Sequence, residues 1–281
     1  ITAGTLVFLA KAAGYTGPIP NAKNSSLHAG NIKASSTATH SISKIKGADL
    51  EKRFMAWPAA KNDHPYLMKK SILNIGLKTA TGSFGGKDVT GWLAVPVNTL
   101  DGAFCTVQFI SPKGEKWNAP GYGFGEGLYL IGTIQPEGLV YLAEGLASAW
   151  SLCNANPDCA TVAIFGANRF ATVAGTLRKK YPNTKLVLVP DKGVESLAHK
   201  AAADCGGYVV EMPSDAPKNH DAWDVEKEGG VQALQALLTS PKVPASTLKP
   251  PFEYERDGTK KNKIVPSVTN VVHALEEFPY L

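Results

Sequence analysis

Acidic side chains that directly follow apolar runs are the residues best placed for chemistry in this sequence. Four acids are candidates: Glu144, Asp191, Asp221 and Asp224. Carboxylate oxygens are the ligands that hard divalent cations prefer. Carboxylates gathered in one place repel one another unless a cation neutralises them or one of them takes up a proton. The four acids therefore predict a Mg²⁺ site, with Mn²⁺ as the alternative ion.

Each acid has a simpler interpretation when it is considered alone. An acidic residue after a strand often caps the helix that follows, and Asp191 or Asp224 could serve that purpose with no metal. A metal site is favoured here because three groups of acids fall on the same predicted edge of a sheet.

A glycine-rich segment upstream of these acids predicts a surface that exposes main-chain N–H groups. Between Gly121 and Gly127, four glycines alternate with two aromatic residues and one acid. Such a segment lets a phosphate or a nucleic-acid strand approach the backbone, and a glycine-rich hairpin without a ligand is the equally supported alternative. Lys113 and Lys116, just upstream, supply the positive charge that an anionic ligand would need.

Alternating strands and helices must position the acids. From Leu139 onward, apolar runs of strand length alternate with segments of helical periodicity. The expected strands are Leu139–Ala143, Thr161–Phe165, Lys185–Pro190 and Tyr208–Met212, and the expected helices are Gly145–Asn154, Phe170–Tyr181, Val194–Cys205 and Val231–Leu238. Such repeats form a mostly parallel sheet whose strands end at one edge, where ligands bind. If their strands are neighbours, Glu144 and Asp191 share one crevice.

A smaller α+β unit is expected before this sheet. Ala48–Trp57 has the apolar spacing of a helix. Trp92–Val97 followed by Ala103–Ile110 predicts two strands joined by a turn at Asp101 and Gly102. Before them, most of residues 1–46 are rich in Gly, Ser, Thr, Asn and Lys without periodicity, which predicts a flexible arm or linker.

Composition sets the remaining bounds. With 281 residues, 44% of them hydrophobic, the chain can build a substantial core, and a net charge of +5 permits a polyanionic partner without requiring one. Four scattered cysteines form no zinc-spaced pairs, so free thiols in a cytoplasmic setting are expected. The apolar stretch Thr5–Ala13 is too short for a membrane span. Because the chain starts at Ile1 rather than Met, we expect a piece of a longer protein.

Several motifs resemble a TOPRIM domain, as found in primases and topoisomerases. They are the run Tyr141–Ala149, the strand that ends in Asp191, and the segment Asp221–Asp224. Further upstream, His64–Leu67, followed by Lys69 and Lys70, is similar to the amino-terminal half of phage and plasmid primases. The resemblance covers about residues 48–238, and the order of the motifs makes it specific.

The resemblance implies an α/β fold with a TOPRIM-type mostly parallel sheet flanked by helices, preceded by a smaller α+β primase subdomain. The implied organisation is a flexible arm over residues 1–46, the α+β subdomain over 47–135, the TOPRIM domain over 136–240, and a linker with the start of a helicase-like domain over 241–281. Within the last part, 241–255 is expected to be linker and Asn270 to lie in a short helix.

The implied function is a DNA primase that synthesises short RNA primers on single-stranded DNA from nucleoside triphosphates, by Mg²⁺-dependent nucleotidyl transfer. Glu144 and Asp191 would be catalytic, and all four acids would hold the metal. Lys113, Lys116 and Lys192 would bind the nucleotide. A helicase domain or partner, no membrane, and a bacterial or phage-infected cytoplasm complete the expectation. A catalytically weakened nucleic-acid-binding module and a TOPRIM-type metal-dependent nuclease are the alternatives.

One position departs from the family pattern. A TOPRIM domain usually has Asp-x-Asp after its third strand, whereas this sequence reads Asp191, Lys192, Gly193. Loss of one acid is expected to weaken or relocate a second cation, with Lys192 adding positive charge near a phosphate. His64 is expected to anchor structure rather than to catalyse. Trp223 is expected in the core, with base stacking as the alternative role.

Overall fold

The computed structural model describes residues 49–239, 241, 252–256 and 262–266. The chain divides into two units, Ile1–Arg53 and Phe54–Leu281. In the first, residues 49–53 are helical, as the sequence predicts, and the helical segment runs on to residue 56. The predicted arm over residues 1–46 and the predicted helix around Asn270 lie outside the described residues.

An antiparallel sheet begins the second unit. It has the order β1-β4-β5-β6, with β1 at Lys78–Thr79, β4 at Leu93–Asn98, β5 at Phe104–Ile110 and β6 at Lys116–Asn118. The predicted hairpin is confirmed, since β4 and β5 pair antiparallel across a turn in which Gly102 takes a φ of 82°. A short pair, β2 (Ser83–Phe84) with β3 (Lys87–Asp88), and the helix α3 (Pro65–Lys70) complete this part.

A five-stranded sheet follows in the chain and forms the centre of the fold. Its order is β11-β10-β8-β9-β7, with β7 at Tyr129–Ile131, β8 at Leu139–Ala143, β9 at Ala160–Ala163, β10 at Lys185–Val189 and β11 at Tyr208–Val209. Every pairing is parallel except that of β7 with β9. The predicted mostly parallel sheet is therefore confirmed, and β8 and β10 are neighbours.

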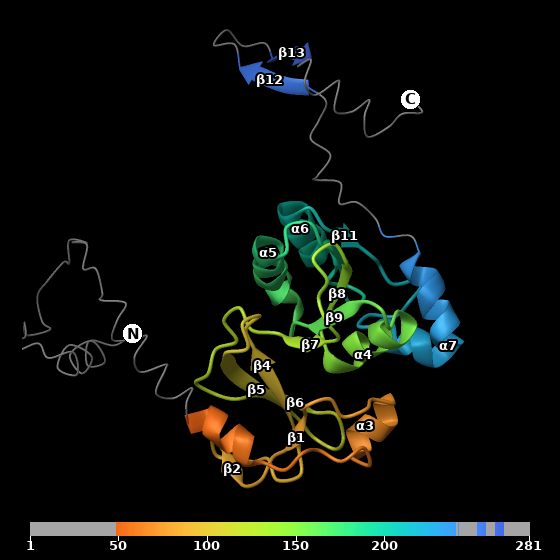
Figure 1. Cartoon of the computed structure of the whole chain (residues 1–281). Helices are drawn as coiled ribbons and strands as arrows, with labels where there is room; N and C mark the ends of the chain where they lie inside the picture. Colours follow the sequence, from red (N-terminus) through yellow and green to blue (C-terminus); the bar gives the residue numbers. More distant parts are fainter. Residues whose placement is uncertain (1–48, 240, 242–251, 257–261, 267–281) are drawn as a thin grey trace, which may run out of the picture. The chain divides into compact units, whose positions relative to one another are not determined.

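Helices cover both faces of this sheet (Figure 1). One face packs against α4 (Leu146–Ala155) and α7 (Ala222–Leu238), and the other packs against α5 (Phe170–Lys180) and α6 (Glu195–Cys205). Successive residues of β8 alternate between the two faces, because Tyr141 belongs to the first core cluster and Leu142 to the second. The alternation follows from the two-residue period of a strand. A 3₁₀ turn, η1 (Ala167–Arg169), leads into α5.

The helix predicted at Val231–Leu238 is confirmed as the second part of α7, but the helical segment before it, residues 222–229, was not predicted. Gly230 inside α7 has a φ of 77°, and this glycine kink interrupts the helical pattern in the sequence. Residues 252–255, expected as linker, belong to β12 (Phe252–Arg256), which pairs antiparallel with β13 (Asn262–Pro266). Aromatic and charged residues alternate along β12, as in a strand.

In the part of the chain that the structure describes, no helix has the length and apolar character that a bilayer span requires.

Candidate active site

Glu144 and Asp191 stand at the point where the order of the parallel strands reverses. From β8 the chain crosses to β9 on one side and then returns to β10 on the other side of β8. In open α/β sheets, ligands bind outside the carboxyl ends of the strands at such a switch point. Glu144 directly follows β8, and Asp191 follows β10 after a single proline. The sequence thus predicted the correct pair of strands.

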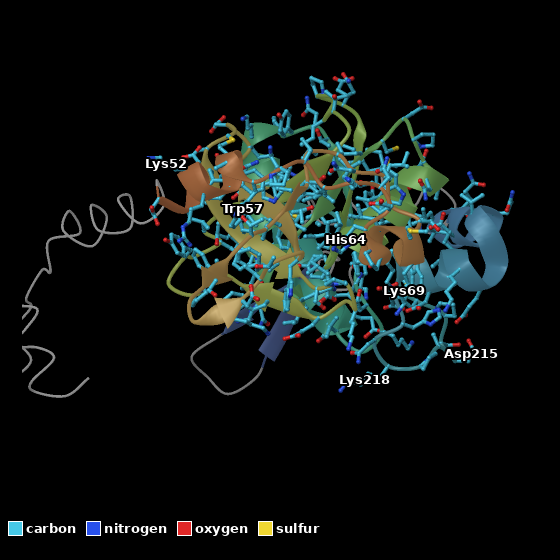
Figure 2. The ribbon with its side chains drawn as sticks, turned by 90° about the horizontal axis from the view of Figure 1, so that it is seen from below. Lys52, Trp57, His64, Lys69, Asp215 and Lys218 are labelled. Carbon is cyan, nitrogen blue, oxygen red and sulfur yellow. The ribbon has the colours of Figure 1, made fainter. Side chains whose placement is uncertain are left out.

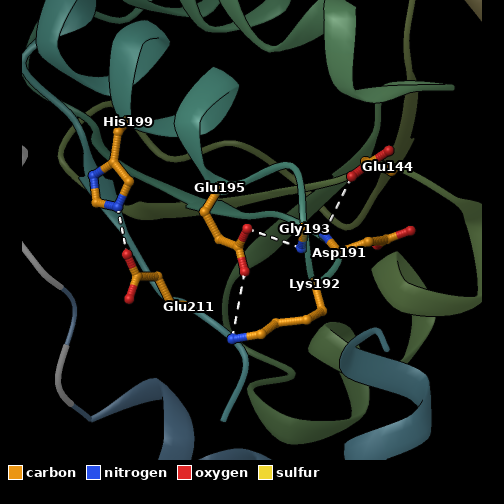
Figure 3. Close-up of polar contacts among 7 residues, drawn as sticks. All are labelled: Glu144, Asp191, Lys192, Gly193, Glu195, His199 and Glu211. Atoms are coloured by element: carbon orange, nitrogen blue, oxygen red, sulfur yellow. Dashed lines mark hydrogen bonds and ion pairs between the residues drawn. The ribbon is translucent and has the colours of Figure 1, made fainter. Parts of the chain in front are cut away.

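A hydrogen bond joins these two strand ends (Figure 3). The backbone N–H of Asp191 donates to Oε1 of Glu144 over 3.1 Å. Burial raises the pKa of Glu144 above its usual range, opposed by hydrogen bonds from backbone N–H groups and by the charge of Lys116. Burial also raises the pKa of Asp191 to about 8, and the carboxylates of Glu144 and Asp221 add to the rise. The pair therefore holds more negative charge than its surroundings stabilise.

Asp221 and Asp224, at the start of α7, lie within electrostatic range of this pair. Asp221 is the N-cap, and the two residues form a capping box: Asp224 N–H donates to Oδ1 of Asp221 over 3.0 Å, and Asp221 N–H donates to Oδ2 of Asp224 over 3.1 Å. The suggestion that Asp191 or Asp224 is an N-cap is corrected, since the cap is Asp221 and no helix begins at Asp191. One oxygen of each carboxylate makes no part of the box and is available to a ligand.

The four acids lie within electrostatic range of one another. The pKa of Asp191 responds first to burial and then to Glu144, Asp221 and Asp224, which all raise it. Their side chains do not converge on one metal position: among the described residues, no three His, Cys, Asp or Glu side chains lie close enough together to hold an ion. The donor set is nevertheless suited to a hard cation, which would offset the repulsion recorded in the raised pKa of Asp191.

A basic pocket of about 280 Å³ adjoins the acids. Its wall combines residues of α3, of the β5–β6 connection, of the start of β6 and of the start of α4 with Gly145 and Asp221. Four lysines line it: Lys69, Lys70, Lys113 and Lys116. Lys116 lines the pocket and also acts on the acids. Burial raises the pKa values of Glu144 and Asp191, and the positive charge of Lys116 lowers both. A Cβ on Gly145 would come within 3.0 Å of the Lys116 ammonium nitrogen, so the bare glycine admits this close approach.

None of the four pocket lysines is neutralised by an ion pair. Within the described ranges, the salt bridges join other cations to acids, and no carboxylate oxygen lies within 4.0 Å of these four ammonium groups. Clustered, unpaired ammonium groups repel one another, and an oligophosphate would relieve the repulsion. The sequence predicted Lys113 and Lys116 as nucleotide-binding residues. It did not predict this role for Lys69 and Lys70, which were noted only as part of the primase-like segment.

Lys192 lies on the loop after Asp191 and is not part of the pocket wall. Its ammonium nitrogen is 3.7 Å from Oε1 of Glu195, and Oε2 of Glu195 accepts a hydrogen bond from Gly193 N–H over 2.8 Å (Figure 3). Gly193 itself has a φ of 99°, a backbone conformation that strains any residue with a Cβ. The loop after Asp191 therefore needs a glycine at position 193, where the TOPRIM pattern has a second acid, and the Glu195 carboxylate stabilises it.

The glycine-rich segment is fixed to the sheet by one arginine. Arg169 donates from Nη1 to the Gly125 carbonyl over 3.1 Å, from Nη2 to the Gly127 carbonyl, and from Nε to the Ile164 carbonyl over 2.6 Å. The guanidinium also lies 4.9 Å from the ring centroid of Phe124. Arg169 carries no signal in the sequence pattern, because its partners are backbone carbonyls. The segment is thus held beside the end of β9.

His64 is a structural anchor, as predicted. Its Nδ1 accepts the Tyr66 N–H over 3.2 Å as the N-cap of α3, so Nε2 carries the proton and donates to the Gly91 carbonyl over 3.0 Å. Burial lowers the pKa of His64, which favours this neutral form. His64 and Lys69 both belong to the α3 region in Figure 2, but only Lys69 reaches the pocket.

No family model and no curated protein matches the chain, whereas several solved structures do. The structure of the DnaG catalytic core aligns with a TM-score of 0.50 at 14% identity, over 74% of this chain and 82% of that one. The RNA polymerase domain of Mycobacterium tuberculosis DnaG primase, solved with a double-stranded DNA oligomer with an overhang, aligns with a TM-score of 0.46 at 13% identity, over 86% and 89%.

The primase fragment of the bacteriophage T7 primase-helicase aligns with a TM-score of 0.43 at 10% identity, over 58% of this chain and 66% of that fragment, slightly less than two thirds of its length. The motifs predicted a mostly parallel sheet flanked by helices with a smaller α+β part before it. The structure, which aligns with the DnaG catalytic core at a TM-score of 0.50, has this architecture. The chain therefore has the fold of a primase catalytic core.

Proposed function

We propose that this chain is the catalytic region of a DNA primase, which joins ribonucleotides into short RNA primers on single-stranded DNA. The observation that carries the proposal is the adjacency of four carboxylates and four unpaired lysines at the switch point of the parallel sheet. Nucleotidyl transfer needs this combination, because the triphosphate must be held by positive charge while its reacting end is brought to a metal-binding acidic site.

Glu144 is assigned the role of proton acceptor. The 3′-hydroxyl oxygen of one nucleotide bonds to the α-phosphorus of the next, the bond to the β-phosphate oxygen breaks, and pyrophosphate leaves. The hydroxyl proton passes to a base, and a carboxylate whose pKa burial has raised accepts a proton more readily than an ordinary one. Backbone N–H groups of Asp191 and Ala167 orient the Glu144 carboxylate for this task.

Asp191, Asp221 and Asp224, together with Glu144, are the residues proposed to hold Mg²⁺ or Mn²⁺. A divalent ion bound there would neutralise the negative charge that develops on the phosphates. Because the carboxylates lie in electrostatic range rather than at ligand distance, binding would draw their side chains together. The capping box permits this, since each of its carboxylates keeps one oxygen outside the box.

The basic pocket is proposed to hold the triphosphate. Lys113 comes from the β5–β6 connection and Lys116 from the start of β6. Lys69 and Lys70 come from the end of α3, so positive charge lines a pocket of about 280 Å³ from two sides. Lys192, on the loop after Asp191, is also proposed to contact the nucleotide. To reach a phosphate its ammonium group would exchange Glu195, now 3.7 Å away, for the substrate.

Single-stranded DNA as template, nucleoside triphosphates as substrates, and a helicase domain or partner belong to the same proposal. The glycine-rich segment held by Arg169 exposes backbone beside the end of β9, where a template or primer strand would pass. A helicase-like continuation of the chain would begin within residues 241–281.

The proposal is tested by incubating the chain with single-stranded DNA, labelled ribonucleotides and Mg²⁺, and by resolving the products by length. Glu144→Gln preserves size and removes the charge, and Asp215→Asn, which changes an exposed acid outside the site, is the matched control. We expect short products from the wild type and from Asp215→Asn, and at least a hundredfold less from Glu144→Gln. Shortened template in place of new strands would identify a nuclease and contradict the proposal.

A further inference from the structure

Two ammonium groups lie over the indole ring of Trp223. Lys70 Nζ is 3.1 Å from the ring centroid, and Lys227 Nζ is 5.0 Å from it. Trp223 is the second residue of α7 and packs partly buried against the first core cluster, whereas Lys70 is the last residue of α3. The contact therefore joins two elements more than 150 residues apart in the sequence, at the edge of the basic pocket.

Lys70 occupies a demanding position for a cation. It is partly buried, and its closest charged surroundings are mixed: Asp221 and Asp224 attract it, and Lys116 and Lys69 repel it. A lysine side chain is flexible, and in such a place it would ordinarily swing to the nearest carboxylate. No salt bridge to a carboxylate is present for Lys70 in the described part of the chain.

The aromatic ring explains why Lys70 keeps away from the acids. The face of an indole attracts an ammonium ion through its quadrupole without carrying a charge of its own. An ammonium group held on the ring keeps its full charge for an anion in the pocket. Asp221 and Asp224 meanwhile stay uncompensated and available to a cation. The ring thus keeps the positive and the negative halves of the site from neutralising each other.

We infer that Trp223 is a positioning residue that holds the Lys70 ammonium at the wall of the basic pocket, where it binds an oligophosphate. The inference deepens the proposed function, on which its biological meaning rests, since the triphosphate of a nucleotide is the ligand of this class. Base stacking is not the role assigned to Trp223, because one face of its ring is covered by Lys70.

A double-mutant cycle separates positioning from mere packing. The measured quantity is the affinity for inorganic tripolyphosphate, determined by titration calorimetry at low salt, with the folded state of every variant checked by thermal unfolding. The variants are Lys70→Ala, Trp223→Leu, the combination of both, and Trp223→Phe, which keeps an aromatic face. Trp92→Leu is the matched control, because Trp92 contacts Lys87 at 4.7 Å and lines no part of the pocket.

We expect Trp223→Leu and Lys70→Ala each to weaken tripolyphosphate binding by about 3- to 30-fold, the range that one cation–π contact or one ammonium group accounts for. If Trp223 acts through Lys70, Trp223→Leu adds nothing further in the Lys70→Ala background. Trp223→Phe should retain most of the affinity, and Trp92→Leu all of it.

Three outcomes overturn the inference. The first is an equal loss on Trp223→Leu with and without Lys70, which would make the effect one of general packing. The second is wild-type affinity in Trp223→Leu, and the third is no tripolyphosphate binding by the wild type. A different result is that the variants give the expected binding cycle with tripolyphosphate but the chain makes no primers. The proposed function would then be wrong, and the positioning role of Trp223 would still hold.

Discussion

The backbone N–H of Asp191 donates to the Glu144 carboxylate over 3.1 Å, and this bond joins the ends of the two strands that flank the switch point of the sheet. The bond brings the two half-buried acids together. Burial and then the charge of Glu144 raise the pKa of Asp191 to about 8, so negative charge at this place is unfavourable.

Asp191→Asn should stabilise the metal-free protein at high pH. The folded-state pKa of Asp191, about 8, lies above its ordinary value of 3.8, so the folded state binds the proton more tightly. The contribution of this group to stability is present below about pH 4 and is lost as pH rises to about 8. At pH 8, with a chelator, we expect Asp191→Asn to raise the melting temperature by about 2 °C or more, equivalent to ~1 kcal/mol.

The gain from Asp191→Asn should shrink toward pH 4 and should also shrink when Mg²⁺ or Mn²⁺ is added at pH 8. Asp215→Asn serves as the control and should show no gain at either pH. A pH-independent effect of Asp191→Asn would mean that neither burial nor the neighbouring carboxylates raise the pKa of Asp191 in the folded state.

Asp221→Ser separates helix capping from chemistry. Serine caps a helix about as well as aspartate, so the free energy of unfolding should change by less than about 0.5 kcal/mol, whereas Asp221→Ala should lose about 1 kcal/mol more. Primer synthesis should fall at least tenfold in both variants, because both remove the carboxylate. Full activity in Asp221→Ser, measured beside its urea unfolding curve, would reduce Asp221 to a cap.

Placing an aspartate at position 193, where the TOPRIM pattern has its second acid, should not improve primer synthesis. Gly193 has a φ of 99°, and a new Cβ would meet only the flexible Lys218 side chain, with Cγ at 3.5 Å and Cε at 4.0 Å. The obstacle is therefore backbone strain rather than crowding. Gly193→Asp and Gly193→Ala should therefore lose stability alike, on the order of 1–3 kcal/mol. A Gly193→Asp variant that is as stable as the wild type and more active would show that the loop accommodates the second acid readily.

Arg169→Lys should loosen the glycine-rich segment without unfolding the sheet. A lysine cannot reproduce the three hydrogen bonds that Arg169 makes to separate carbonyls. Amide exchange over residues 121–127 should quicken by about tenfold, since net hydrogen bonds contribute about 1 kcal/mol each, while protection in β8 stays unchanged. Arg178→Lys, which disturbs a similar set of carbonyl contacts elsewhere, should leave residues 121–127 unaffected. Equal exchange in both variants would contradict the role of Arg169.

The sequence predicted the acids better than it predicted the lysines. Glu144 and Asp191 follow apolar strands, and strand periodicity with right-handed crossovers is enough to bring them to one edge. Lys69 and Lys70 reach the pocket only because α3 packs near the start of α7, a tertiary contact that no local pattern announces. The capping-box spacing of Asp221 and Asp224 was present in the sequence, but Gly230 obscured the helix that follows it.

The central claim is that four carboxylates at the switch point act as one cation site, and direct Mn²⁺ binding tests it most directly. Mn²⁺ titrated into the full chain and followed by electron paramagnetic resonance should show binding in the wild type and in Asp215→Asn. Glu144→Gln and Asp191→Asn should each weaken the binding by at least tenfold. Equal Mn²⁺ binding in all four proteins, or none in the wild type, would contradict the claim.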